Sequence, residues 1–412
     1  MLSLRLLVTG ATLQPGDVSV LTEHGLVDLR QLETEAAVLG VVAIDVRAYT
    51  SLTVTFANPE LTVLNNTGAP INGCAQGEVC ELRPTLASSS VTLPLAATQQ
   101  FANRNIVLDF DLANSLVASL ASLSPSMTLH ILETPAGPWF LWDAGSPRPE
   151  FHDRLGEITG AYDASLQDPD LDPFAFNFFI LRTALGEFRL HEAGAAFLEF
   201  ADCPAASFSC LEAGQTVEVD SILSMATQIR LVASPHGPPV LKGVIIATDN
   251  AAQFGMVVLA EAPDVGGVKI GDRVQINLLP GASFGVNADT LMVSGLNFSA
   301  AADLLPGQTV QVDVAGQSGT ATPSVIDTAR VILKQGSFTA GVNAILSATE
   351  FTVDTLPAIH TSGLVRVEAL AAGFDQATSV VDLHVGDPVS MRGLLFKTSG
   401  TPVLVASLVR RQ

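Results

Sequence analysis

Apolar and polar residues alternate along this chain in short runs, most clearly in a ten-residue phrase that occurs twice. The phrase covers residues 211–220 and again residues 304–313, and both copies contain Gly-Gln-Thr-Val. Glycine accepts the positive φ of a tight turn, and the residues after it can leave the turn as a strand. With a period of two, Val217 and Val219 face a core while Glu218 faces outward. The phrase predicts a turn followed by a strand.

A looser copy of the phrase covers residues 383–392, and a clipped copy covers residues 270–277. A phrase that recurs at such spacing is typical of repeated small β-units. We therefore expect Gly214, Gly307 and Gly386 to precede the same strand of three similar barrels. The repeat is a folding signature and contains no catalytic pattern.

The residues around the phrase predict repeats of about five strands each. Every repeat has four further landmarks: an opening glycine (Gly156, Gly243, Gly336), an apolar strand (178–181, 256–259, 351–353), a loop phenylalanine (Phe200, Phe284, Phe374) and a closing strand (228–232, 330–333, 404–409). Strands that close on themselves leave few open edges. We predict three OB-like β-barrel repeats at 156–234, 240–335 and 336–412, the middle one with an insertion around 278–302.

The first part of the chain, residues 1–133, predicts an antiparallel β-sandwich, which makes the whole protein all-β. Turn signals such as Asn58-Pro59 separate its short strand-like runs. These runs cover residues 4–8, 18–21, 26–29, 51–56, 61–64, 91–95, 106–110 and 128–132. Short helices are expected at residues 32–39 and at residues 112–123, the second with Asp111 as its N-cap.

Residues 134–155 form a linker that contains four prolines and both tryptophans of the chain, Trp139 and Trp142. Together with Phe140, the tryptophans act either as a wedge between domains or as an exposed anchor for a ligand or partner. We favour the wedge because large aromatic side chains are usually buried.

Composition excludes several classes of function. Charged residues make up only 15% of the 412 residues, and the formal net charge is −21. That charge repels phosphate backbones, so the sequence disfavours nucleic-acid binding. No apolar run approaches the ~18 residues that a transmembrane helix needs.

The four cysteines fall in two local pairs, Cys74 with Cys80 and Cys203 with Cys210. Neither pair has redox or zinc-ligand spacing, so two local disulfides are the simplest interpretation. Disulfides indicate an extracytoplasmic compartment, with the protein secreted or at the cell surface. Reduced surface thiols are the alternative. Because residues 1–5 do not form a signal peptide, we expect Met1 to lie inside or after the true leader.

One cluster has the chemistry of a ligand site. Asp168, Asp170 and Asp172 alternate in a loop, as carboxylates that bind a hard cation such as Ca²⁺ do. The glycine and distal glutamate of an EF-hand are missing, so a solvated acidic loop is the favoured interpretation. Asn65 and Asn297 lie in glycosylation triplets, but ordinary turn asparagines are the favoured interpretation unless the source glycosylates its proteins.

The sequence contains no signature of catalysis. Its seven histidines are scattered, and G-x-S-x-G, H-E-x-x-H and Walker motifs are missing. We therefore predict no enzymatic activity, no catalytic residue and no cofactor, with Ca²⁺ as the single candidate ion.

The glycine-turn phrase, the glycine-led opening strand and the closing apolar strand resemble bacterial domain-of-unknown-function family 5666. Residues 49–59 and 108–112 resemble the domain that often precedes these repeats, family 4382. The resemblance covers nearly the whole chain. It implies an exported protein of repeated β-barrel modules and implies no reaction.

These observations predict an extracellular or cell-surface structural protein that self-associates into oligomers or filaments. The alternative is an exported module that binds carbohydrate or another ligand. Sugar sites present exposed aromatics, for which Trp139, Trp142, Tyr49 and Tyr162 are the candidates. A surface glycan is thus a second possible partner, beside further copies of the chain.

Overall fold

The computed structural model is an all-β protein that divides into two compact units, Ser3–Glu150 and Phe151–Gln412. The structure describes residues 3–411 apart from 22–24, 30–44, 46, 66–67, 77, 96–103, 117–119, 134–149, 163–176, 184–185, 200–207, 223–224, 234, 236, 251, 263–264, 269–271, 289–290, 319–322 and 354–363.

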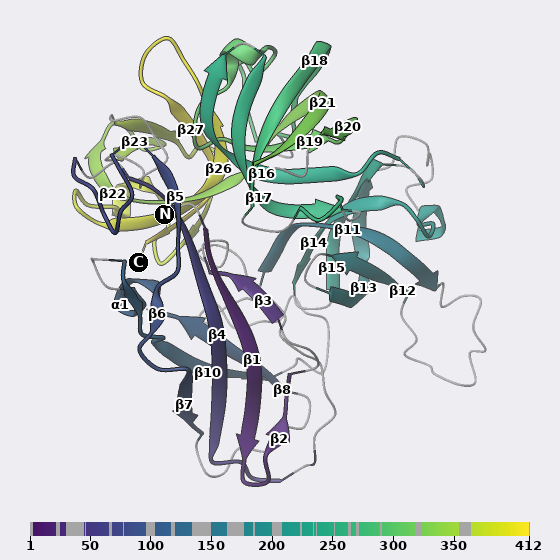
Figure 1. Ribbon diagram of the computed structural model, residues 1–412, viewed down its shortest axis with the longest axis vertical. Coiled ribbons are helices and arrows are strands. Elements are labelled where there is room, and N and C mark those ends of the chain that lie inside the picture. The colour runs from purple at the N-terminus through teal and green to yellow at the C-terminus, as the bar shows by residue number, and fades with distance from the viewer. Residues whose placement is uncertain are drawn as a thin grey trace. The chain divides into compact units, whose positions relative to one another are not determined.

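The first unit is built around two long antiparallel strands, β1 (Ser3–Gln14) and β4 (Ser51–Leu64), which lie side by side (Figure 1). Their apolar side chains alternate with polar ones, and Leu4, Leu52 and Val54 are among those fully buried. Shorter strands continue the sheet on both sides: β2 (Val18–Ser19) and β3 (Gly25–Asp28) pair with β1, and β5 (Val79–Leu82) and β7 (Ser90–Pro94) pair with β4.

Among its described residues, this unit also has two small sheets. One pairs β8 (Arg104–Phe110) with β10 (Met127–Glu133), and the other pairs β6 (Thr85–Leu86) with β9 (Ser122–Leu123). Phe56 of the large sheet meets Phe110 of β8 edge to face, with ring centroids 6.3 Å apart. The large sheet and the β8–β10 pair therefore share apolar contacts, as the sandwich prediction requires.

Two local predictions in this unit are wrong. The helix expected at residues 112–123 is a single turn, α1 (Leu112–Ser115), capped by Asp111, whose Oδ1 accepts the Asn114 N–H at 2.9 Å. The turn expected at Asn58-Pro59 is not formed, because both residues lie inside β4. The strand continues through them with Asn58 at a φ of 47°. Asparagine tolerates this left-handed conformation better than most residues. The helix expected at residues 32–39 lies outside the described residues.

The second unit begins with barrel 1, a closed five-stranded barrel in the order first, second, third, fifth, fourth. Its third and fifth strands run parallel, and their register shifts in the middle of the third strand. The strands are β11 (Glu150–Tyr162), β12 (Phe178–Thr183), β13 (Gly186–Glu199), β14 (Thr216–Ile222) and β15 (Met225–Ala233), with the 3-10 helix η4 (Phe208–Cys210) before β14.

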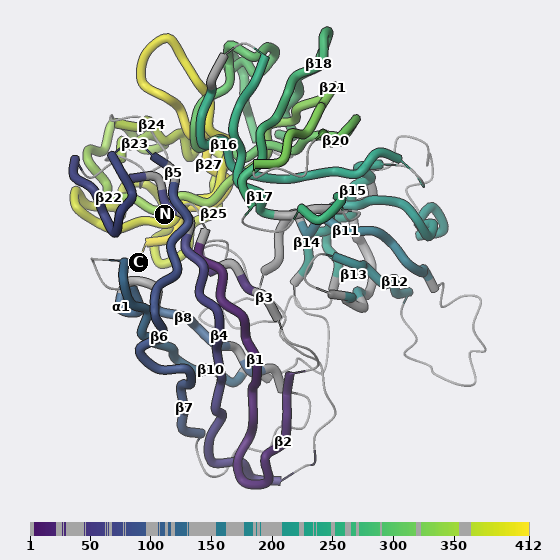
Figure 2. The backbone as a smooth tube through the Cα atoms, in the orientation of Figure 1, coloured from purple at the N-terminus to yellow at the C-terminus, as the bar shows by residue number. Residues whose placement is uncertain are grey.

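Barrels 2 and 3 repeat this order of strands when one short strand of each, β20 (Gly316–Ser318) or β25 (Gly373–Asp375), is left out of the count. The third strand again pairs parallel with the fifth and closes the ring. Figure 2 shows the course of the backbone through the barrels. Barrel 2 contains β16 (Val240–Asn250), β17 (Gln253–Ala262), β18 (Arg273–Val286), η5 (Ala301–Asp303), β19 (Thr309–Asp313), β20 (Gly316–Ser318) and β21 (Ser324–Lys334). Barrel 3 contains β22 (Gly336–Ile345), β23 (Glu350–Val353), β24 (Val365–Glu368), β25 (Gly373–Asp375), η6 (Val380–Asp382), β26 (Pro388–Phe396) and β27 (Val403–Arg411).

The equivalence of the three glycine turns is confirmed. Gly214, Gly307 and Gly386 have φ values of 89°, 94° and 93°, and they precede the equivalent strands β14, β19 and β26, each of which pairs with the last strand of its barrel. The backbone N–H of each glycine donates to the first strand, at 2.7, 2.7 and 2.8 Å. The following residue closes the turn, because its side-chain oxygen accepts a backbone N–H from three residues earlier. One local geometry is thus used three times.

The clipped copy of the phrase is not a fourth equivalent, since the strand that follows it, β18, is the third strand of barrel 2. The loop positions expected for Phe284 and Phe374 are also wrong, because both residues lie in strands, β18 and β25. The edge-to-face contact of Phe284 with Phe298, at 5.8 Å between centroids, joins β18 to the segment after it. Phe200 lies outside the described residues.

Candidate interaction surfaces

The residues that the sequence proposed for ligands lie largely outside the described part of the chain. This holds for Asp168, Asp170 and Asp172 and for both tryptophans, as well as the side chain of Tyr162. Tyr49 is described, and its fully buried ring lies 5.2 Å from the Arg47 guanidinium carbon. The proposal of Tyr49 as a sugar platform is therefore wrong. None of the described aromatic side chains is among the exposed large hydrophobic residues.

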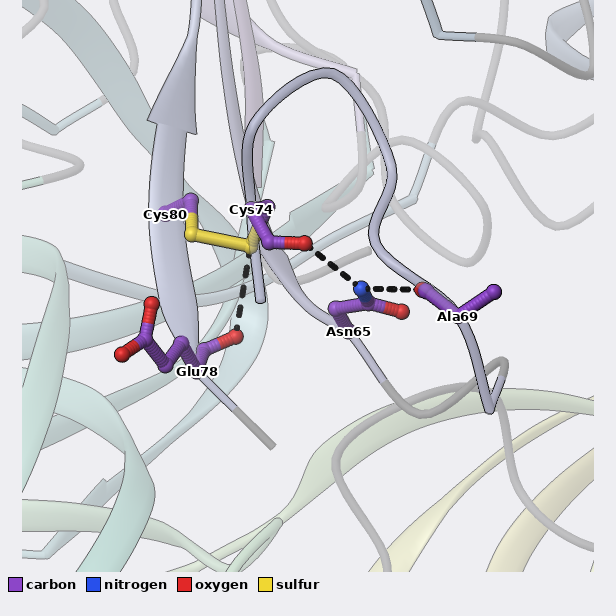
Figure 3. Close-up of a disulfide and its surroundings, with 5 residues drawn as sticks. All are labelled: Asn65, Ala69, Cys74, Glu78 and Cys80. Atoms are coloured by element: carbon purple, nitrogen blue, oxygen red, sulfur yellow. Dashed lines mark hydrogen bonds between the residues drawn. A yellow bond between two sulfur atoms is a disulfide. The ribbon is translucent and has the colours of Figure 1, made fainter. Parts of the chain in front are cut away.

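The Cys74–Cys80 disulfide is present, with the two Cα atoms 5.8 Å apart (Figure 3). The buried Asn65 lies beside it and donates from Nδ2 to the carbonyls of Ala69, at 2.7 Å, and Cys74, at 2.9 Å. Both hydrogen bonds engage the amide nitrogen of Asn65 within the fold, so Asn65 is a structural asparagine in this conformation. Asn297, in contrast, is exposed.

Cys210 also takes part in a disulfide. Its predicted partner, Cys203, lies outside the described residues.

The described residues offer little that a reaction could use. They contain no group of three or more His, Cys, Asp or Glu side chains that could hold a metal ion. Of the histidine side chains, only that of His384 is described, and its Nδ1 lies 3.6 Å from the Asp387 carboxylate in an exposed turn. What the structure does bring together is the surfaces through which consecutive barrels meet.

The junction between barrels 1 and 2 contains a buried ion pair. Lys334, the last residue of β21, bonds to the Glu218 carboxylate on β14, and both side chains are at most 2% exposed. Arg230 on β15 approaches the same Glu218 oxygen at 3.2 Å. Glu218 does point out of its own barrel, as predicted, but barrel 2 covers it. Removal of either partner would destabilise the fold, because it would leave an unpaired charge buried.

The junction between barrels 2 and 3 is mainly apolar. Where β26 and β27 pair over residues 394–396 and 403–406, alternate residues face two cores: Leu395, Leu404 and Ala406 pack inside barrel 3, while four others join the core cluster of barrel 2. Those that join barrel 2 are Leu394, Phe396, Val403 and Val405. This strand pair is consequently buried on both faces. Sequence reasoning missed the junction, although residues 394–396, Leu-Leu-Phe, break the alternation and could have signalled it.

The part of barrel 2 that barrel 3 covers is its cap segment, which we define as the 3-10 helix plus the glycine turn, residues 301–308. Leu305 packs into the core cluster of barrel 3. The Gln308 Nε2 donates to the Leu395 carbonyl at 3.0 Å, while Lys397 donates to the Ala302 carbonyl at 2.9 Å. Side chains from both barrels thus hold the cap segment.

The corresponding cap segment of barrel 3 is residues 380–387. Asp382 ends its 3-10 helix and accepts hydrogen bonds from the Thr378 hydroxyl and from the Thr378 N–H, the latter at 2.9 Å. These bonds, that of the hydroxyl foremost, lower the pKa of Asp382 below its ordinary value of 3.8. Asp303 occupies the corresponding position in barrel 2, where its carboxylate accepts the Ser299 N–H at 2.7 Å. In barrel 1 the matching residue is the disulfide-bonded Cys210.

No protein-family model matches this chain, and no curated protein matches it either. Within the described residues, no helix has the length and apolar character needed to cross a membrane.

Proposed function

We propose that this protein is a non-enzymatic structural protein of the cell surface or extracellular space that self-associates into oligomers or filaments. The observation that carries the proposal is the way consecutive barrels are joined. Each junction buries side chains from both of its barrels, through Glu218 with Lys334 in one case and the outer face of β26–β27 in the other. Modules fastened in this manner suit a mechanical or scaffolding role.

Composition supports self-association in the same proposal. With only 15% charged residues, neutral side chains cover much of the exterior, against about 25–35% charged residues on a typical designed soluble surface. Burial of apolar surface against another copy gains about 25 cal/mol per Å². Mutual repulsion from the net charge of −21 opposes this gain and is screened beyond about 8 Å at physiological ionic strength.

The test is a salt series on the full chain, followed by analytical ultracentrifugation and electron microscopy. We expect the weight-average mass to rise with salt and protein concentration, because screening weakens the repulsion while apolar contacts persist. A monodisperse monomer at high concentration and high salt would show that the surface is merely neutral and would contradict the proposal.

The extracytoplasmic location can be tested separately. The Cys74–Cys80 disulfide and the disulfide-bonded state of Cys210 support it, since disulfides persist in oxidising compartments. Alkylation without reductant, followed by mass spectrometry, should label none of the four cysteines. Labelling of all four would remove the support for this location. The resemblance to families 5666 and 4382 enters the proposal as a further expectation of an exported protein.

A further inference from the structure

The Glu218 carboxylate, at the junction between barrels 1 and 2, is buried and has one oxygen without a partner. Its Oε2 accepts a hydrogen bond from the Lys334 Nζ and lies 3.2 Å from the Arg230 guanidinium. Its Oε1 is buried as well and has no hydrogen-bond partner among the described residues. A buried polar atom in this state costs free energy, so the ion pair alone leaves the site incompletely satisfied.

The repeat does not require a charge at this position. Counted from the glycine of each turn, Glu218 corresponds to Gln311 in barrel 2 and to Ser390 in barrel 3. All three side chains are buried. The same turn and strand therefore form around neutral residues, and the carboxylate is particular to the barrel that meets Lys334.

We propose that Glu218 and Lys334 condense to an intramolecular isopeptide bond, an amide between the Cδ of Glu218 and the Nζ of Lys334. This bond would join barrels 1 and 2 covalently, and the ion pair is the state from which it forms. Because the bond lies within one chain, it does not rest on self-association.

The condensation needs no co-reactant and releases one water molecule. The Lys334 ammonium first transfers a proton to Oε1 of Glu218, and burial favours this transfer because it penalises both ions. The Nζ lone pair then attacks Cδ. As a second proton moves from Nζ to the Oε1 hydroxyl, the Cδ–Oε1 bond breaks and water leaves. The product is a neutral amide in place of two buried ions.

The geometry of the junction suits each part of this step. Arg230 approaches Oε2, the oxygen that is retained, where negative charge develops during the attack; a donor at that place stabilises the transition state. Oε1 is the oxygen that leaves, and no hydrogen bond to another described residue has to be broken for it to do so. Strands β14 and β21 hold the amine and the carboxyl together, and intramolecular reactions of well-oriented groups reach effective concentrations of about 10⁵–10⁸ M.

The test is intact mass spectrometry of the full chain after denaturation and reduction of its disulfides. We expect the wild type to be lighter than its sequence by the mass of one water molecule. A tryptic digest should then contain one branched peptide that joins the segment with Glu218 to the segment with Lys334, uncleaved after Lys334. The matched control is Lys334→Arg, which keeps the positive charge but has no amine that can attack, since arginine stays protonated. It should have its full sequence mass.

Arg230→Gln tests the role of Arg230 and should slow the loss of water by about a hundredfold in a time course that begins with newly synthesised protein. Circular dichroism confirms that each variant folds. A wild type at its full sequence mass, with the two segments in separate peptides, would overturn the proposal. So would loss of water that persists in a folded Lys334→Arg variant. An unchanged rate in a folded Arg230→Gln variant would overturn the role given to Arg230.

Discussion

At the scale of single residues, the cap segments show how a few side chains fix one backbone geometry. In barrel 3, Gly386 provides the positive φ of 93°, and Asp387 closes the turn by accepting the His384 N–H. Asp382 holds the preceding 3-10 helix through Thr378. Each of these roles can be removed by one substitution that leaves the rest of the segment in place.

The first residue-scale prediction concerns the backbone of Gly386. A Cβ at this position would meet nothing within 4 Å, so Gly386→Ala tests conformation without steric conflict. We expect it to lower the free energy of unfolding by about 1–2 kcal/mol, the cost of the left-handed conformation for an L-residue. The matched control is Gly400→Ala, since that position is equally open and lies outside the positive-φ region. Equal thermal stability of the two variants would contradict the prediction.

The second residue-scale prediction concerns pH. The folded pKa of Asp382 lies below its ordinary value of 3.8, so this carboxylate stabilises the fold above about pH 4 and ceases to do so as the pH falls through its folded pKa. Thr378→Ala removes the hydroxyl, the largest cause of the lowered pKa, and should raise the pKa of Asp382 in an NMR titration. Thr378→Ser keeps the hydroxyl and should restore the low value. An unchanged pKa in Thr378→Ala would mean that the backbone N–H alone is responsible.

At the scale of elements, the strand order depends on local patterns, whereas the junctions depend on contacts between distant segments. Lys334 lies 116 residues after Glu218 and becomes its partner only when both barrels have formed. We expect Glu218→Gln to cost about 3–5 kcal/mol in the free energy of unfolding, because it leaves a buried charge without its counterpart. Replacement of both residues, as E218L/K334M, should cost less than the single change.

A surface ion pair provides the control for this experiment. Glu157 and Arg182 pair at 2.5 Å, and the Arg182 side chain is 54% exposed. Exposed pairs contribute about 0–1 kcal/mol, so Glu157→Gln should have little effect in the same denaturation measurement. Similar losses in E157Q and E218Q would show that burial between barrels adds nothing to the Glu218–Lys334 pair.

The same distinction explains what could be predicted from the sequence. The glycine turns, the opening and closing strands and the apolar second strands could be predicted, because period-two patterning and a required positive φ are local signals. The helix expected at residues 112–123 failed because pairing of β9 with β6 overrode local preference. The outward position of Glu218 was predicted correctly, but its burial by Lys334 could not be, since no local pattern encodes a neighbouring barrel. The candidate Ca²⁺ site at Asp168, Asp170 and Asp172 stays a prediction, because these residues lie outside the described part of the chain.

At the scale of the whole molecule, the junction between barrels 2 and 3 links the stability of two folding units. Phe396 belongs to a strand of barrel 3 but is fully buried in the core cluster of barrel 2. A barrel with part of its core supplied by its neighbour cannot keep its full stability when that neighbour unfolds. The two barrels should therefore unfold in one calorimetric transition, in the manner of repeats whose interfaces contribute to stability.

Phe396→Ala tests this coupling directly. The loss of a buried phenylalanine costs about 3–5 kcal/mol, and here the cost falls on a surface shared by two barrels. Hydrogen exchange followed by mass spectrometry should show faster exchange in β16 and β19 of barrel 2 as well as in β26 and β27 of barrel 3. The reason is that Phe396 packs in the core of barrel 2 but belongs to a strand of barrel 3.

The control is Phe254→Ala, which removes a fully buried phenylalanine from the core cluster of barrel 2 itself. It should accelerate exchange in barrel 2 to a similar extent and reach barrel 3 only through the junction. If Phe396→Ala changes exchange in barrel 3 alone, the barrels fold independently, and the junction is a contact between finished modules rather than a shared core.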